Sequence, residues 1–173
     1  NCYARVLSHR LGGKLWGNDV PRREVKSVWN DLAKFQKKAA EAGEIHRVFV
    51  GSMIDIFEKP RPLVDAKGNK VMIDVPTDHG PRRMPVDTGV LRENLFDFIT
   101  DGHFPNLMFL FLTKRPSNIN KYIPPSWKRE CPKNVMFGTS PVNQETADKL
   151  IPQLLEAPGK KFLSVEPMLG PIN

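Results

Sequence analysis

The chain has 173 residues, a length that suits one sizeable domain. With 40% hydrophobic and 26% charged residues, it has the composition of a soluble globular protein, not of a disordered tail. Two cysteines, Cys2 and Cys131, are too few for a disulfide framework and cannot alone form a four-thiolate metal site. The sequence contains no apolar run near the roughly 18 residues of a membrane span and no export signal, so we expect a cytoplasmic protein without a membrane partner.

The net charge of +7 and the isoelectric point near 9.5 permit attraction to phosphates. The basic residues are dispersed in pairs and never form a run of five or more, which is typical of an ordinary solvated surface. Nucleic acid is therefore a candidate partner that the charge alone does not establish. The basic pairs are Arg22-Arg23, Lys37-Lys38, Arg82-Arg83, Lys128-Arg129 and Lys160-Lys161.

The first half of the chain predicts a helix, a buried strand and an insertion. Asp19 can cap a helix and Pro21 can occupy its first turn, and apolar residues then recur at spacings of three and four up to Gly43. Residues 47–51 form a short apolar run that predicts a strand buried on both faces. Residues 59–85 are rich in proline and predict an inserted loop, with a possible hairpin turning at residues 66–69.

Helices and strands alternate in the second half. The predicted elements are a helix over 87–100, a strand over 106–112, a short helix over 117–123 with a proline-rich connector, a strand over 134–138, a helix over 143–155 with Pro152 as a kink, and a strand over 161–165. This alternation predicts a parallel sheet with helical crossovers, either doubly wound or a (β/α) barrel. We favour a partial barrel in a single domain spanning residues 1–173, because no G-x-G-x-x-G fingerprint is present. The first barrel strand would lie upstream of Asn1.

Polar residues follow each predicted strand and would meet at one rim, because ligands bind beyond the carboxyl ends of parallel strands. The candidates are Ser52 and Asp55, Thr113 to Arg115, Thr139 and Ser140, and Glu166. The four histidines are scattered without metal-ligand spacing, and Cys131 has no motif partner. These residues predict a binding rim without naming its ligand.

Six sequence blocks, in order, carry a family resemblance. They are Asn-Cys-Tyr-Ala from position 1, Arg-Val-Phe-Val-Gly-Ser-Met-x-Asp-x-Phe from 47, Phe-Leu-Thr-Lys-Arg-Pro from 111, Asn-Val-x-x-Gly-Thr-Ser from 134, Asn-Gln-Glu-Thr-Ala-Asp from 143, and Phe-Leu-Ser-Val-Glu-Pro-x-Leu-Gly-Pro from 162. Together they resemble the phage and prophage three-cysteine-motif family of uncharacterised proteins, which is similar to radical S-adenosylmethionine (SAM) enzymes. The resemblance covers most of the chain outside the insertion.

The resemblance implies that three cysteines bind a [4Fe-4S] cluster whose open iron holds the amino and carboxylate groups of SAM. Cys2 matches the last of the three, and the other two would lie upstream of Asn1. Thiolates are the usual cluster ligands. Tyr3 would shield the cluster or stack near the nucleoside.

The resemblance also implies roles for the rim residues, each with a structural alternative. Ser52 and Asp55 would meet the methionine amino group of SAM, or cap a helix. The segment from Thr113 through Lys114 to Arg115 would hold the SAM carboxylate, a substrate phosphate or a surface acid. Thr139 and Ser140 would bond the ribose hydroxyls or cap the next helix. Glu166 would accept from ribose or substrate, or form an ion pair.

The leading hypothesis is therefore a radical SAM enzyme of phage origin, located in the host cytoplasm. It would cleave SAM reductively, with electrons from a flavodoxin or ferredoxin, and would then abstract a hydrogen from an unknown substrate. Nucleic acid and a nucleotide are the candidate substrates. No residue is assigned to the catalytic step. The alternative is a noncatalytic, basic nucleic-acid-binding protein on the same barrel. A third reading is a phosphate-binding barrel enzyme that uses Lys114 and Arg115.

Overall fold

The computed structural model describes residues 6, 8, 10, 16–51 and 54–173. The chain divides into two compact units, which we describe separately. The sheet unit comprises Trp29–Glu58 and Asn94–Asn173. The insertion unit comprises Lys59–Glu93 and the described residues up to Val28.

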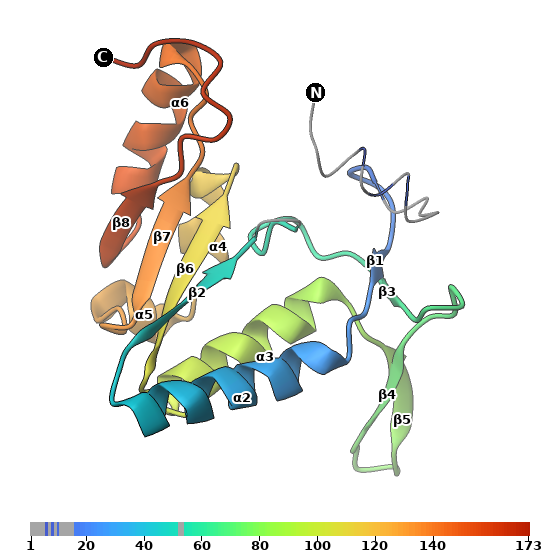
Figure 1. Cartoon of the computed structure of the whole chain (residues 1–173). Coiled ribbons are helices and arrows are strands. Elements are labelled where there is room, and N and C mark those ends of the chain that lie inside the picture. The colour runs from blue at the N-terminus through green and yellow to red at the C-terminus, as the bar shows by residue number, and fades with distance from the viewer. Residues whose placement is uncertain (1–5, 7, 9, 11–15, 52–53) are drawn as a thin grey trace. The chain divides into compact units, whose positions relative to one another are not determined.

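A four-stranded parallel sheet forms the centre of the sheet unit (Figure 1). Its order is β2 (His46–Val50), β6 (Leu107–Thr113), β7 (Val135–Thr139) and β8 (Lys160–Leu163), so spatial order follows chain order. This confirms the predicted mixed α/β class with a parallel sheet. The described strands form an open sheet, and closure into a barrel of radical SAM type stays a prediction.

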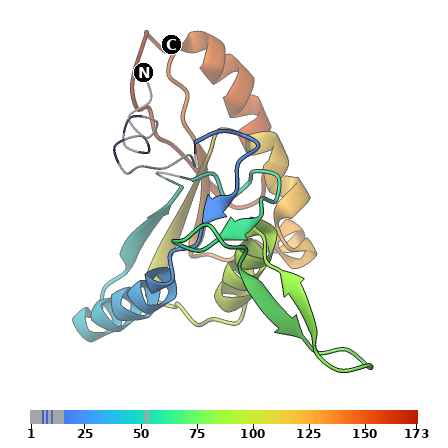
Figure 2. The same ribbon diagram turned by 90° about the vertical axis from the view of Figure 1, so that its right-hand side faces the viewer.

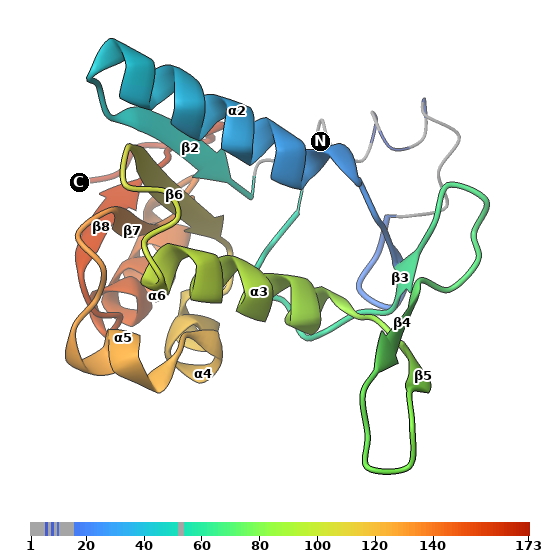
Figure 3. The same cartoon turned by 90° about the horizontal axis from the view of Figure 1, so that it is seen from below.

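Helices pack against one face of this sheet. They are α2 (Ser27–Ala42), α3 (Thr88–Thr100), α4 (Ile119–Tyr122), α5 (Pro125–Arg129) and α6 (Gln144–Leu155), with a 3₁₀ turn at Pro116–Asn118 before α4. In the sheet unit, Trp29 of α2 contacts Phe98 of α3 edge to face, with ring centroids 5.4 Å apart. Figure 3 shows these two helices running alongside each other.

The core between helices and sheet is mainly aromatic. Alternate residues of β6 are buried in it, which is the period-two pattern expected of a strand covered on that face. In β7, Val135 and Phe137 belong to this core, and Gly138 is buried against the ring of Phe162. Its fully buried rings are Phe57, Phe96, Phe109, Phe111, Trp127 and Phe137. The opposite face of the sheet is also apolar but more exposed to solvent. There, Phe49, which is 43% exposed, contacts Phe162 edge to face, with ring centroids 6.2 Å apart.

The insertion unit is built from short strands. β1 (Arg22–Arg23) pairs in parallel with β3 (Leu63–Val64), and β4 (Met72–Val75) pairs antiparallel with β5 (Arg82–Pro85). Figure 2 shows the β4–β5 ribbon extending away from β1 and β3. The core of the insertion unit is small, and its buried residues are Leu63, Val64 and Val86.

Four predicted elements need correction. The strand β2 is not buried on both faces, because it is an edge strand of the described sheet: none of its residues is fully buried, and Phe49 is 43% exposed. The first helix begins at Ser27 and not after Pro21, because Arg22 and Arg23 pair with β3. The main hairpin joins β4 to β5, although residues 65–69 do form a turn, with Asp65 accepting from the backbone N–H of Asn69. The connector after residue 123 contains the short helix α5, whose Trp127 is buried in the core.

Candidate functional site

The carboxyl ends of the four sheet strands lie at one edge, which we call the rim. Parallel pairing aligns Val50 with Phe111, Thr113 with Thr139, and Thr139 with Leu163. The polar segments after these strands therefore begin next to one another (Figure 1). This is the edge where open α/β sheets bind ligands.

Asp55 is the centre of a hydrogen-bond network at the rim. One carboxylate oxygen accepts from the Thr113 hydroxyl at 2.7 Å and from the backbone N–H of Phe57 at 3.1 Å. The other accepts from Arg115 Nη1 at 2.8 Å and from the backbone N–H of Lys114 at 3.3 Å. Two carboxylate oxygens offer about four acceptor positions, so the chain itself uses most of them.

This network ties the ends of β6 and β7 together. Thr113 and Thr139 are 1% and 0% exposed, and the Thr139 hydroxyl donates to the Thr113 carbonyl at 2.7 Å. The Thr113 hydroxyl also accepts from the backbone N–H of Arg115 at 2.9 Å. The hydroxyls of both threonines thus hold the rim's shape.

The charged groups of the rim differ in their exposure. Lys114 and Glu166 are exposed, and neither has an ion-pair partner among the residues that the structure describes. The Arg115 side chain is 39% exposed beside an Asp55 side chain that is only 15% exposed. Ser140 is buried. Lys114 and Glu166 are therefore the groups best placed to meet a ligand from solvent.

Two of the structural alternatives raised by the sequence can be judged. Asn143, and not Thr139 or Ser140, caps α6, because its side chain accepts from the backbone N–H of Thr146 at 3.0 Å. Asp55 caps no helix and instead closes an Asx-type turn onto Phe57.

Sequence reasoning missed one residue that supports the rim. Asn118 donates from Nδ2 to the Phe57 carbonyl at 2.9 Å and so holds the segment that follows Asp55. The two residues lie 61 positions apart in the chain, and no local pattern signals such a contact.

The predicted cluster ligand Cys2, with Tyr3 and Ser52, lies outside the described residues. Cys131 is at the opposite edge of the sheet: it precedes β7 and lies against Gly159, immediately before β8. Burial raises the pKa of its thiol, against a smaller opposing effect of Lys161. Within the described part of the chain, no group of three metal-ligating side chains occurs.

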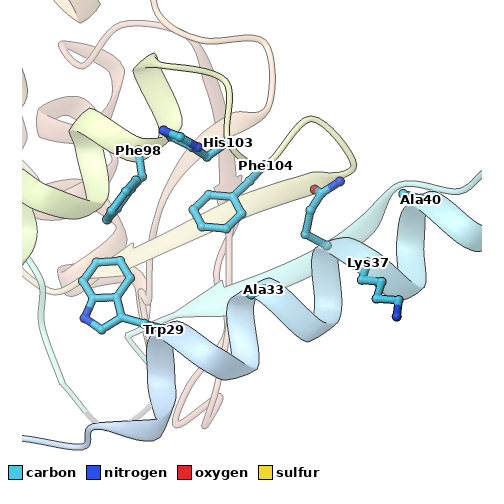
Figure 4. A pocket seen from close by; sticks show the side chains of 8 residues that line it. Trp29, Ala33, Lys37, Ala40, Phe98, His103 and Phe104 are labelled. Atoms are coloured by element: carbon cyan, nitrogen blue, oxygen red, sulfur yellow. The ribbon is translucent and has the colours of Figure 1, made fainter.

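A groove of about 480 Å³ lies between α2 and α3, separate from the rim (Figure 4). Trp29, Phe98 and Phe104 form its aromatic wall, and Ala33 and Ala40 lie along α2. The amide of Gln36, which also lines the groove, bonds to Asn106 through both its oxygen and its nitrogen. The groove is therefore mainly apolar, and the Gln36 amide in its lining already has hydrogen-bond partners within the protein.

Comparison with known proteins addresses the family. The model of the family described as Protein of unknown function (DUF5131) matches residues 61–173, well over half of the chain. The chain belongs to the DUF5131 family. The matched segment contains β3 to β8 and the rim residues from Thr113 to Glu166, but not Asp55.

Comparisons with curated proteins and with solved structures found no match. These findings therefore support membership of an uncharacterised family, DUF5131, and nothing more of the expected resemblance. Phage origin and radical SAM chemistry stay predictions. Separately, among the described helices none is both long enough and apolar enough to cross a membrane.

Proposed function

We propose that this DUF5131 protein is a radical SAM enzyme that binds SAM at the rim. The observation that carries the proposal is the arrangement at the rim, where a part-buried Asp55–Thr113–Arg115 network fixes the end of β6, and two exposed groups of opposite charge, Lys114 and Glu166, follow β6 and β8. SAM presents a carboxylate, an ammonium and ribose hydroxyls, so it needs both a cation and an acceptor. The order of the sequence blocks supports the same reading.

The donor set fits SAM in its chemistry. The Lys114 ammonium would hold the SAM carboxylate, and the Glu166 carboxylate would accept from the SAM ammonium or ribose. Because Asp55 already binds Arg115, Thr113 and two backbone N–H groups, we assign it a positioning role. The Phe49–Phe162 face of the sheet would border the nucleoside, while Thr139 and Ser140 would shape the floor of the site.

The cluster would require Cys2 and two further thiolates, as the resemblance implies. When bound, the cluster and SAM supply one-electron reductive cleavage of SAM and hydrogen abstraction from a substrate. The chain's own contribution is to orient SAM and to exclude water from the reacting centre.

Anaerobic iron and sulfide analysis tests the cluster, with absorption near 400 nm as a second readout. It should be carried out on this chain and on a version that includes any residues preceding Asn1 in the natural protein. We expect the longer version to bind about four irons, Cys2→Ala to lose them, and Cys131→Ala to retain them. If neither version binds iron, or if both cysteine variants lose it equally, the proposal is wrong.

SAM binding tests the rim separately. Isothermal titration should show weaker SAM binding for Lys114→Ala and Glu166→Gln, while Lys34→Ala, a change at an exposed lysine of α2, leaves it unchanged. Release of 5′-deoxyadenosine with a chemical reductant then tests the reaction. Equal SAM affinity in all three variants would remove Lys114 and Glu166 from the site.

A further inference from the structure

The β4–β5 ribbon has no assigned role in the proposed function. Its strands pair Ile73 with Met84, Asp74 with Arg83 and Val75 with Arg82. The connecting loop is closed by a hydrogen bond from the Gly80 N–H to the Thr77 carbonyl at 2.9 Å and by one from the Thr77 hydroxyl to the Gly80 carbonyl at 2.6 Å. The ribbon is therefore an ordered arm with a defined tip.

Both faces of this arm are open to solvent. All four residues of β5 are exposed, and so is the loop over 76–81. An isolated two-stranded hairpin is marginal in water. This one is anchored at its base, where the Val86 N–H donates to the Val71 carbonyl and the Leu63 N–H donates to the Val86 carbonyl, with Leu63 and Val86 buried.

The arm carries two adjacent guanidinium groups. Successive residues of a strand point to opposite faces, so Arg82 and Arg83 give each face of the ribbon one arginine. Neither has an ion-pair partner among the described residues, and the residue across from Arg82 is the apolar Val75. Arg83 lies directly across from Asp74, whereas Arg82 has no carboxylate opposite it and is well suited to bind phosphate through two parallel hydrogen bonds.

The Arg82 face also carries an apolar pair. Ile73 and Met84 lie opposite each other and are 43% and 42% exposed. A surface that combines arginine with apolar side chains can contact both the phosphates and the thymine methyl groups of a DNA groove. The other face pairs Arg83 with Asp74 and is nearer to neutral.

We propose that the β4–β5 ribbon is a DNA-binding arm that enters the major groove of a duplex. Strands about 4.8 Å apart make a ribbon that fits a groove about 12 Å wide. The deep, narrow major groove of A-form RNA does not admit such a ribbon, which favours DNA over duplex RNA. The net charge of +7 adds attraction to the polyanion. The inference is independent of cluster and SAM binding.

Fluorescence anisotropy with a labelled 20-base-pair DNA duplex, at salt concentrations from about 50 to 200 mM, tests the arm. The variant is Arg82→Ala/Arg83→Ala. The matched control, Lys37→Ala/Lys38→Ala, removes the same charge from α2 in the sheet unit. We expect the arginine variant to lose about tenfold or more in affinity and its salt slope to fall by about two, one for each lost phosphate contact. The control should lose less than about threefold.

Thermal melting by circular dichroism checks folding, and Arg82→Lys/Arg83→Lys, which keeps the charge, should retain most of the binding. The proposal is overturned if the natural chain does not bind the duplex, if both alanine variants lose affinity equally, or if duplex RNA of the same sequence binds as well as DNA.

Discussion

Removing the Asp55 carboxylate should destabilise the sheet unit strongly, even though the residue lies at an edge. Asp55→Ala leaves the hydroxyl of Thr113, which is 1% exposed, without its acceptor at 2.7 Å. A buried donor without a partner costs about 1–3 kcal/mol, and loss of the Phe57 N–H bond about 1 kcal/mol. The guanidinium of Arg115 is 39% exposed and can be rehydrated, so the ion pair adds only about 0.5–1 kcal/mol.

The expected loss in the free energy of unfolding is therefore about 3–4 kcal/mol for Asp55→Ala. Asp55→Asn keeps one oxygen acceptor and should cost about 1–2 kcal/mol, and Arg115→Ala less than about 1 kcal/mol. Urea unfolding followed by far-UV circular dichroism measures these values.

A double-mutant cycle isolates the contact between Asp55 and Thr113. Thr113→Val removes the hydroxyl at nearly constant volume, so Asp55→Ala should cost about 1–2 kcal/mol less in that background than in the natural chain. If the two changes are additive, or if Asp55→Ala costs no more than Arg115→Ala, the carboxylate does not organise the rim and the reasoning fails.

Three further outcomes are expected. Gly138→Ala would place a methyl group into the ring of Phe162 and should cost about 1–3 kcal/mol, less when combined with Phe162→Ala; an unchanged urea midpoint would contradict the packing. Burial raises the pKa of the Cys131 thiol. In a Cys2→Ala background, this thiol should react with iodoacetamide more slowly than a free thiol at pH 8, and its reaction should accelerate as the pH rises. A rate equal to that of the free thiol would contradict the burial. Hydrogen bonds, chiefly from the Asn69 side chain, lower the pKa of Asp65. The ionised Asp65 carboxylate therefore stabilises the fold above its unfolded pKa, and this stabilisation is lost as the pH falls through the folded pKa. Asn69→Ala should raise the Asp65 pKa measured by NMR, and an unchanged pKa would exclude this cause.

The sequence patterns located the sheet because its strands are apolar runs too short for a helix and are followed by glycine or polar residues. All four were predicted within one or two residues of their observed bounds, as were α3 and α6. The pairing of β1 with β3 was not foreseen, because two-residue strands carry no periodic signal and Pro21 favoured a helix start. The proline-rich connector was not expected to contain the helix α5, because prolines within and beside it obscure a helix of one turn.

The rim was predictable in position but not in detail. Any polar residue that follows a strand of a parallel sheet reaches the same edge, so the candidates could be chosen from the sequence. Which of them bond to one another depends on side-chain geometry between distant segments, as with Asp55 and Thr113, 58 positions apart. Cys2, Tyr3 and Ser52 fall outside the described residues, so their roles stay predictions.

The long connection between β2 and β6 has a consequence for how this family can vary. It runs from residue 51 to residue 106 and contains most of the insertion unit, yet the two strands it joins are sheet neighbours. The entropic cost of closing a loop grows only logarithmically, by about 0.6 kcal/mol for each doubling of its length. The part of this connection between Lys59 and the start of α3 at Thr88 can therefore be lengthened, shortened or replaced at little thermodynamic cost, and recognition of a partner can diverge there while Asp55, α3, the sheet and the rim are kept.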